Sequence, residues 1–351
     1  MFTFISLFAC TEYGFHNKIG INNGANDSNG TSDGSGFDFS TDSLIEDEPE
    51  YNSLVGRVCS PTGGDWIVDA YVYVEIDTNN DGVIDYISDD YTNGEGFYTL
   101  NDLPQGEHIV YISKGSFTKE MVVDVLPGTT ELPFDVCELD QPSIAVVDGE
   151  YDHIEQILQE LGIEYTLYDN NTASSMFGNL ELMETYDIIF INCGSYADVE
   201  NASNPQKIDN VKEFVNNGGS IYASDHAAYS IGYAFPNAVD FIGVNGLAST
   251  VEAKIIDPTM QTILESSDAT IDYDLNQWMV FNTVASNVEV LVSGDVQFIN
   301  STNSVELRND LPLAVRYERG EGTVVYTTFH NERQGSTFAV DKLLQEMIFS
   351  L

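Results

Sequence analysis

Two short polar segments that are far apart in the sequence carry the side chains best suited to chemistry. Asp225-His226 follows one apolar stretch, and His330-Asn331-Glu332 follows another. Imidazoles and carboxylates are the groups that transfer protons near neutral pH and that bind divalent metals. Asp225, His226, His330 and Glu332 could therefore hold a metal ion with a bound water, or they could form a hydrogen-bonded acid–base cluster.

The two apolar stretches before these segments explain how they could meet. Residues 220–224 and 323–329 read as buried strands, each ending where the polar residues begin. In an open parallel sheet, the carboxyl ends of the strands border one crevice, which is where such folds place their sites. We therefore expect Asp225 and His330 to lie side by side.

The surrounding sequence predicts such a sheet. Strand candidates at 143–148, 163–168 and 186–192 alternate with helical patterns at 151–161 and 208–217. This alternation predicts an α/β flavodoxin-like parallel-sheet domain over residues 141–351. Further elements are expected as a helix at 258–266, strands at 288–292 and 296–299, a final hairpin of strands 313–317 and 323–329 across residues 318–322, and an amphipathic helix that closes the chain.

The segments Gly-Gly-Ser-Ile-Tyr-Ala-Ser-Asp-His (218–226) and Gly-Thr-Val-Val-Tyr-Thr-Thr-Phe-His-Asn-Glu (322–332) resemble the class I glutamine amidotransferase-like superfamily, including its trehalose-utilisation-like branch. The resemblance places Asp225 on the family's nucleophilic Cys, His330 on its base and Glu332 on the acid that orients the base. A carboxylate is a poorer nucleophile toward an amide than a thiolate. The resemblance therefore implies an amidotransferase-like domain that does not hydrolyse glutamine by the usual route.

Cys193 offers an alternative nucleophile. It follows the strand predicted at 186–192 and so also points to the carboxyl edge of the sheet. The competing interpretation is a small buried thiol at a strand end. For Asp225 and His330 the competing interpretation is a hydrogen-bonded remnant without chemistry.

Residues 52–138 follow a different pattern, with short β-branched and aromatic runs separated by Gly, Pro and Asn. This pattern predicts an N-terminal all-β sandwich domain. The run Phe97-Tyr98-Thr99-Leu100 followed by Leu103-Pro104-Gln105-Gly106 resembles the carboxypeptidase regulatory-like (transthyretin-like) modules. That resemblance implies an accessory or adhesive domain without catalysis.

A candidate calcium loop lies between two of these strands. Asp77, Asn79, Asp81 and Asp85 offer oxygen ligands at alternating positions around Gly82. Oxygen ligands and a Gly at the sharp turn are what a Ca²⁺ loop needs. The sequence predicts a structural Ca²⁺ ion here, with an acidic hairpin turn as the alternative.

The cysteines indicate in which cellular compartment the protein resides. Met1 to Cys10 resembles the end of a bacterial lipoprotein signal, which would make Cys10 the lipidated residue, and 11–51 has the composition of a disordered tether. We expect an exported protein at the cell surface or outer membrane of a Gram-negative bacterium, attached only through that anchor. Cys59 and Cys137 bracket the β region and are either paired or two free thiols.

Charge and aromatic residues restrict the partners. With 12 Lys and Arg against 57 Asp and Glu, the formal net charge is -45, which excludes nucleic acid as a partner. The predicted function is binding or assembly with a carbohydrate or a surface protein; the rival is a hydrolase that uses a metal or Cys193. Four aromatic residues near the crevice would support sugar binding unless they belong to the core, namely Tyr229, Tyr233, Phe235 and Trp278.

Overall fold

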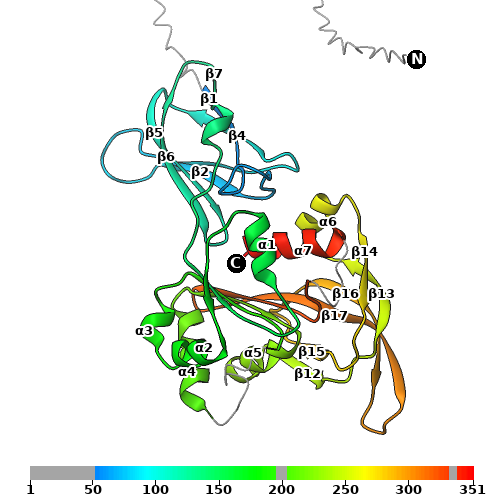
Figure 1. Ribbon diagram of the computed structural model, residues 1–351. Coiled ribbons are helices and arrows are strands. Elements are labelled where there is room, and N and C mark those ends of the chain that lie inside the picture. The colour runs from blue at the N-terminus through cyan, green and yellow to red at the C-terminus, as the bar shows by residue number, and fades with distance from the viewer. Residues whose placement is uncertain (1–51, 195–203, 332–337) are drawn as a thin grey trace, which may run out of the picture. The chain divides into compact units, whose positions relative to one another are not determined.

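A computed structural model describes residues 52–194, 204–331 and 338–351. These residues all fall within one compact unit, Glu48–Leu351. Within it, an all-β part precedes a larger part in which helices cover a sheet (Figure 1). None of the described helices is both long and apolar enough to cross a lipid bilayer. Cys10 and the predicted tether lie outside the described residues.

The β part contains two small sheets over a shared apolar core. One sheet has the order β4-β1-β7 and the other β3-β2-β5-β6. Their strands are β1 (Asn52–Arg57), β2 (Tyr71–Ile76), β3 (Tyr86–Tyr91), β4 (Phe97–Leu103), β5 (Gly106–Lys114), β6 (Phe117–Val125) and β7 (Thr129–Glu131), and a 3-10 turn, η1 (Phe134–Val136), follows. Strand β2 buries Val72 and Val74 and turns Tyr71 and Tyr73 to the other face, because side chains alternate along a strand. Cys59 and Cys137 form a disulfide in the structure.

The larger part is built on a nine-stranded sheet of order β14-β13-β16-β17-β18-β11-β10-β8-β9. The last five strands are parallel, and their order corresponds to 2-1-3-4-5 along the chain, which is the flavodoxin-like arrangement. They are β8 (Ile144–Val147), β9 (Thr166–Tyr168), β10 (Ile188–Ile191), β11 (Ser220–Ser224) and β18 (Gly322–Thr327).

The other half of this sheet corrects the expectation of a parallel sheet, although the predicted hairpin across residues 318–322 is confirmed. Strands β13 (Ser249–Ile255), β14 (Asp268–Tyr273), β16 (Glu289–Ile299) and β17 (Val305–Arg319) pair antiparallel. Strand β16 also joins the two strands expected at 288–292 and 296–299. Its pairing with β17 shifts register on either side of Ser293 and Gly294, which explains why the sequence pattern breaks there although the strand continues.

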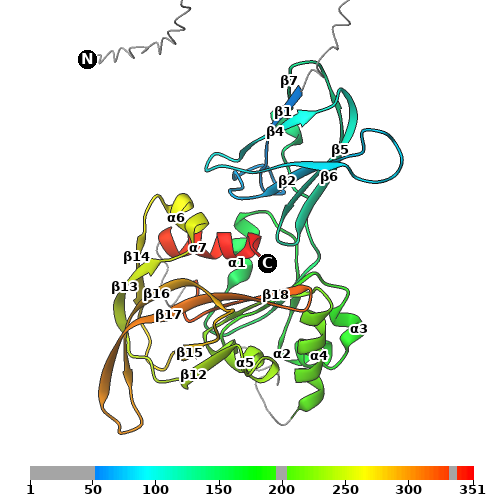
Figure 2. The ribbon, with the colours of Figure 1, turned by 180° about the vertical axis from the view of Figure 1, so that it is seen from behind.

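Helices cover both faces of the sheet (Figures 1 and 2). Helices α1 (Ile154–Glu160) and α7 (Phe338–Phe349) pack with one core, while α2 (Asn170–Phe177), α4 (Pro205–Asn216) and α5 (Ala228–Ala234) pack with the other. Strand β10 shows the division, since Ile188 and Phe190 belong to the first core and Ile189 and Ile191 to the second. A parallel strand buried on both faces is continuously apolar for this reason.

The remaining elements are short. They are α3 (Leu180–Met183), η2 (Asp225–Ala227), α6 (Pro258–Leu264) and a two-stranded sheet of β12 (Val239–Gly243) and β15 (Val280–Val284). The sequence pattern did not predict α2, because its residues are mostly small and polar. The Asp169 side chain accepts a hydrogen bond from the Thr172 N–H and caps this helix.

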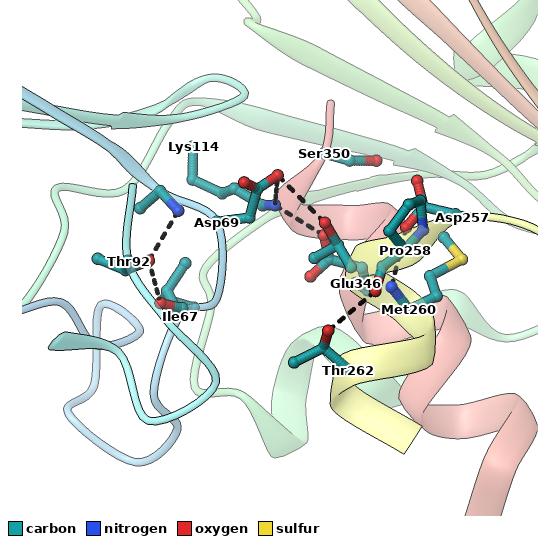
Figure 3. A network of polar contacts seen from close by, with 12 residues as sticks. Ile67, Asp69, Thr92, Lys114, Asp257, Pro258, Met260, Thr262, Glu346 and Ser350 are labelled. Atoms are coloured by element: carbon teal, nitrogen blue, oxygen red, sulfur yellow. Dashed lines mark hydrogen bonds and ion pairs between the residues drawn. The ribbon is translucent and has the colours of Figure 1, made fainter. Parts of the chain in front are cut away.

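Contacts join the β part to helices α6 and α7 (Figure 3). Lys114 Nζ lies 2.8 Å from Glu346 Oε1, and these side chains are only 8% and 6% exposed. The rings of Phe117 and Phe349 pack 4.9 Å apart between centroids. The domain boundary predicted near residues 138–141 stays a prediction, because the described residues form one compact unit.

Candidate functional site

Three neighbouring parallel strands deliver side chains to one point at the carboxyl edge of the sheet. Cys193 follows β10, Asp225 follows β11 and His330 follows β18. All three are buried, and the Cys193 sulfur, an Asp225 carboxylate oxygen and a His330 ring nitrogen lie within 4.8 Å of one another. The structure therefore brings Asp225 and His330 together and adds Cys193 to them.

Asp225 occupies a sharp turn between β11 and η2. Its φ of 42° is positive, which is uncommon for a residue other than Gly and stores about 1–3 kcal/mol of strain. The Tyr326 hydroxyl donates a hydrogen bond to the Asp225 carbonyl over 2.9 Å and holds the turn in place. In α/β-hydrolases, a strained strand-to-helix turn of this kind presents the nucleophile.

The Asp225 carboxylate is fixed at both oxygens. Oδ1 accepts a hydrogen bond of 2.6 Å from the Met279 N–H, and Oδ2 accepts one of 3.4 Å from the Cys193 thiol. Burial raises the pKa of this carboxyl, while the imidazoles of His226 and His330 act against that rise. The side chain is thus held in one orientation beside a sulfur.

Cys193 does not have the environment of a nucleophile. Burial raises its pKa well above the ordinary value for a thiol, and the charge of Asp225 raises it further. The thiolate is the reactive form of Cys, so a thiol held protonated at neutral pH is inert toward a carboxamide. This environment speaks against Cys193 as a nucleophile.

His330 is fixed through one ring nitrogen only. Its Nδ1 lies 3.1 Å from the Asn331 carbonyl oxygen, which can only accept, so Nδ1 carries the proton in the neutral ring. Nε2 is buried and has no hydrogen-bond partner among the residues that the structure describes. A buried nitrogen with a free lone pair calls for an explanation.

Asp152 and Ser224 support the cluster, and sequence reasoning missed both. The Ser224 hydroxyl donates to Asp152 Oδ2 and accepts from the Cys193 N–H over 2.9 Å. Burial raises the pKa of Asp152, and the neighbouring His330 opposes that rise. The position of Asp152 in the sequence could have revealed it, because Asp152 lies in the loop just after β8, at the same edge of the sheet.

Other predicted members of the site do not join it. His226 Nε2 bonds to the Gln277 carbonyl over 2.7 Å and is 3.9 Å from Asp225 Oδ2. Adjacent residues project in different directions, which explains why His226 stays outside the cluster while Asp225 is inside. Glu332 lies outside the described residues. A pocket of about 220 Å³ opens over Cys193, Asp225 and His330.

The candidate calcium loop joins β2 to β3. The Asp77 carboxylate accepts hydrogen bonds from the backbone N–H groups of Asp81 and Gly82, and Asp85 bonds to Thr78. Within the described residues, the loop's carboxylates are not among the groups of three ligand atoms that converge to within 4.8 Å. Its donor set of carboxylates and one amide is nevertheless the type that Ca²⁺ prefers.

The outer face of sheet β3-β2-β5-β6 carries a row of tyrosines, which we call the tyrosine face: Tyr71, Tyr73, Tyr91 and Tyr111. Ring centroids lie 5.2 Å apart for Tyr71 and Tyr73, 5.0 Å for Tyr71 and Tyr91, and 5.0 Å for Tyr73 and Tyr111. Tyr91 is 56% exposed and the others are half-buried.

A hollow of about 750 Å³ adjoins this face and includes Tyr111 in its lining. Its other lining residues include Asp77, Asp102, Glu75 and His108. The tyrosine face therefore continues into a concave region whose walls offer both acceptors and donors for hydrogen bonds.

The aromatic residues that the sequence placed near the crevice do not form such a surface. Trp278 is fully buried, stacks on Tyr273 at 4.0 Å and donates its ring N–H to the Leu247 carbonyl. Phe235 is also buried, so both belong to the core. Tyr229 and Tyr233 on α5 do stack, with ring centroids 6.2 Å apart, and are partly exposed, so they form a small aromatic pair. The larger exposed aromatic cluster lies on the β part.

No protein-family model matches the chain, and no curated protein matches its sequence. Similar solved structures include a protein described as a GMP synthase component from Thermoplasma acidophilum, at 15% identity and a TM-score of 0.40, covering 60% of this chain and 94% of that one. PurLQS from Thermotoga maritima has 13% identity and a TM-score of 0.41, covering 60% and 98%.

A glutamine amidotransferase from Thermotoga maritima is 10% identical with a TM-score of 0.36, covering 54% of this chain and 76% of that one. Likenesses at these TM-scores do not establish a shared fold on their own. The flavodoxin-like assignment rests on the order and direction of the five parallel strands.

Proposed function

We propose that this protein is an exported binding protein that holds a neutral carbohydrate on its tyrosine face, and that its amidotransferase-like part does not hydrolyse glutamine. The observation that carries the proposal is the row of four accessible tyrosine rings leading into a 750 Å³ hollow. Pockets of this size accommodate small organic ligands.

Tyrosine suits a carbohydrate because its ring and its hydroxyl meet different parts of a sugar. The C–H faces of a pyranose pack on aromatic rings, and the sugar hydroxyls bond to polar groups at the edge. Partial desolvation, together with the nearby Asp89 carboxylate, raises the pKa of Tyr71, so an acceptor lies beside this hydroxyl. Glu75 and Glu120 lie near Tyr111 and add acceptors for hydroxyl donors.

Charge narrows the class of carbohydrate. The chain has a formal net charge of -45, and the tyrosine face and its hollow carry carboxylates. A uronic acid or a sulfated glycan would meet repulsion there. The proposal is therefore restricted to neutral glycans.

The absence of glutamine hydrolysis is proposed from the chemistry of the crevice. The turn that would present a nucleophile presents the Asp225 carboxylate, and the neighbouring Cys193 is held as a thiol. Neither group attacks a carboxamide readily. We expect the purified protein to release no ammonia from glutamine above background.

Glycan binding is tested by affinity electrophoresis through soluble neutral polysaccharides such as xylan, mannan and mixed-linkage glucan, with alginate as the anionic comparison. We expect retardation by at least one neutral polymer and none by alginate. Tyr73→Ala should weaken that binding by about 10-fold, since an aromatic stack contributes about 1 kcal/mol beyond its buried area.

Tyr233→Ala is the matched control, because Tyr233 is 40% exposed but lies on α5, away from the tyrosine face. It should bind as the unaltered protein does. Failure of every neutral polymer to bind, or binding that survives Tyr73→Ala with Tyr111→Ala, would overturn the carbohydrate proposal.

We also propose that Cys10 is lipidated and anchors the protein at the outer membrane or cell surface. The support is the apolar run before Cys10 and the polar segment after it. Radiolabelled palmitate should enter the unaltered chain and not Cys10→Ser, and the variant should leave the membrane fraction. Equal labelling of both would contradict the anchor.

A further inference from the structure

We propose that Cys193, Asp225 and His330 form a binding site for one divalent transition metal, zinc before others, with an open coordination position toward the 220 Å³ pocket. The ligands would be Cys193 Sγ, an Asp225 carboxylate oxygen and His330 Nε2. This inference goes beyond the proposed carbohydrate binding and concerns a different part of the molecule.

The spacing of the ligand atoms fits a tetrahedral metal. Zinc binds sulfur at about 2.3 Å and carboxylate oxygen at about 2.0 Å, so a tetrahedral angle separates the two ligand atoms by about 3.5 Å. The observed distance from Cys193 Sγ to Asp225 Oδ2 is 3.4 Å. The His330 ligand atom lies within 4.8 Å of both, so a modest side-chain adjustment completes the set.

His330 is an independent indication of a ligand. Metal-binding histidines usually donate their other ring N–H to a carbonyl or carboxylate, which fixes the tautomer. His330 does this through Nδ1 and the Asn331 carbonyl, while Nε2 is fully buried without a partner among the described residues. A metal at the Cys193–Asp225–His330 cluster would satisfy that lone pair.

Charge favours the same occupant. Binding of a divalent ion displaces the thiol proton of Cys193 to solvent, leaving one thiolate, one carboxylate and one neutral imidazole around the metal. The sum of these charges with that of the ion is zero. Without an ion Cys193 stays a thiol that donates to the Asp225 carboxylate, because two buried anions side by side are strongly unfavourable; a dication neutralises both once the proton has left.

The ligand types select the metal. A thiolate and an imidazole favour zinc and its neighbours over Ca²⁺ and Mg²⁺, which take oxygen ligands. Three protein ligands with a free fourth position are typical of sites where the metal holds a water or a substrate atom. Here that position faces a pocket whose other walls include Tyr151, His226 and Gln277.

Cobalt(II) titration of the chelator-treated full-length chain tests the site, in excess Ca²⁺ and Mg²⁺. We expect one tight equivalent of Co²⁺ and the near-ultraviolet absorption of a thiolate–cobalt bond, with both displaced by one equivalent of zinc. Losing a group that merely orients a ligand lowers metal affinity about 10–100-fold. His330→Gln and Asp225→Asn should therefore lower it by about 100-fold or more.

Four variants separate this site from others. Cys193→Ser should lose the thiolate absorption, whereas Cys10→Ser should keep it. His108→Gln should bind cobalt within about 2-fold of the unaltered protein, because His108 bonds to the Pro104 carbonyl on the β part and does not line the pocket of about 220 Å³. His153→Gln should keep the thiolate absorption, although Asp148, His153 and Glu155 form another convergent cluster.

Absence of a one-equivalent thiolate–cobalt complex in the unaltered protein would overturn the proposal without any variant. So would a complex that persists in Cys193→Ser, or tight binding that His153→Gln removes and His330→Gln retains. Carbohydrate binding is measured separately, and neither outcome here changes what the tyrosine face is expected to do.

Discussion

The β part and the α/β part hold their candidate chemistry in opposite settings. The tyrosine face and the loop at 77–85 are accessible, and each comes from residues close in sequence or from neighbouring strands. The cluster of Cys193, Asp225 and His330 is buried and draws on three strands far apart in sequence. The accessible sites suit a glycan or Ca²⁺, whereas the buried cluster suits a small ion that accepts a sulfur ligand, such as Zn²⁺.

The two parts also differ in what stabilises them. A disulfide links the two ends of the β part. The apolar core of the β part continues onto one face of the α/β sheet, and a second core covers the other face. This difference predicts that the β part is stabilised by a covalent bond in addition to packing, and the α/β part chiefly by packing.

Removing the disulfide should have the largest effect. Cys59 and Cys137 are separated by 78 positions, and closing a loop of that length lowers the entropy of the unfolded chain by an amount worth roughly 4 kcal/mol. Cys59→Ala with Cys137→Ala should lower the free energy of unfolding by about that much in urea titrations. Cys10→Ser is the control, and a loss below about 1 kcal/mol would show that the β part does not depend on the bond.

The buried ion pair comes next, because it joins the two parts. Lys114→Ala leaves the Glu346 carboxylate buried without its cation and should lower the free energy of unfolding by about 3 kcal/mol. Lys114→Met with Glu346→Leu should recover most of that loss, since no buried charge remains. Unfolding by urea measures all three proteins.

The exposed pair of Lys254 and Asp310 is the matched control for this cycle. Its atoms are closer, at 2.6 Å, but its side chains are 59% and 63% exposed. Lys254→Ala should therefore change the free energy of unfolding by less than about 1 kcal/mol. Equal losses from Lys114→Ala and Lys254→Ala would mean that burial does not set the strength of the contact.

The sequence predicted features built from neighbouring residues better than features built from distant ones. The strand at 220–224 was predicted to the residue, because Gly219 and Asp225 bound a short run, Ser-Ile-Tyr-Ala-Ser, whose centre is apolar. Helix α2 was missed, because its small polar residues carry little periodic signal. The short connection at residues 318–322 predicted the antiparallel pairing of β17 with β18. The other antiparallel pairs were missed, because apolar alternation does not indicate in which direction a neighbouring strand runs.

Predicting the crevice required the strand topology as well as the hydrophobic pattern. The meeting of Asp225 and His330 followed from expecting two parallel strands to end at one edge. Asp152 and the tautomer of His330 depend on side-chain contacts that no spacing encodes. The tyrosine face was missed because its rings come from β2, β3 and β5, whose register the sequence does not state.

The pH dependence of the free energy of unfolding should show an effect of intermediate size, and it tests the buried Glu346 carboxyl of α7. Burial raises the pKa of Glu346 from 4.5 to about 6, although Lys114 opposes the rise. The folded state therefore binds the proton more tightly than the unfolded state, and this contribution to stability is complete below pH 4.5 and lost as the pH rises through 6.

The size of that loss is about 2 kcal/mol, since each unit of pKa is worth about 1.36 kcal/mol. The difference in free energy of unfolding between the unaltered protein and Glu346→Gln should shrink by that amount from below pH 4.5 to above pH 6, because Gln does not titrate. Subtracting the variant removes the contribution of the many other carboxylates. A difference that stays constant with pH would contradict the raised pKa.

Calcium should have the smallest effect, and it tests whether the loop at 77–85 is a site at all. Its ligands are exposed, and Asp77 and Asp85 already bond within the loop, so we expect the weak affinity of extracellular calcium modules. An ion present near its dissociation constant stabilises by about 0.5 kcal/mol. Adding millimolar Ca²⁺ to chelator-treated protein should raise the melting temperature slightly in the unaltered chain and not in Asp81→Asn. Mg²⁺ controls for general screening of the net negative charge. If Ca²⁺ raises the melting temperature of both proteins equally, the loop is an acidic turn and not a calcium site. The cluster of Cys193, Asp225 and His330 then remains the proposed metal site. Among the described residues, His330 Nε2 has no partner there, and an ion would supply one.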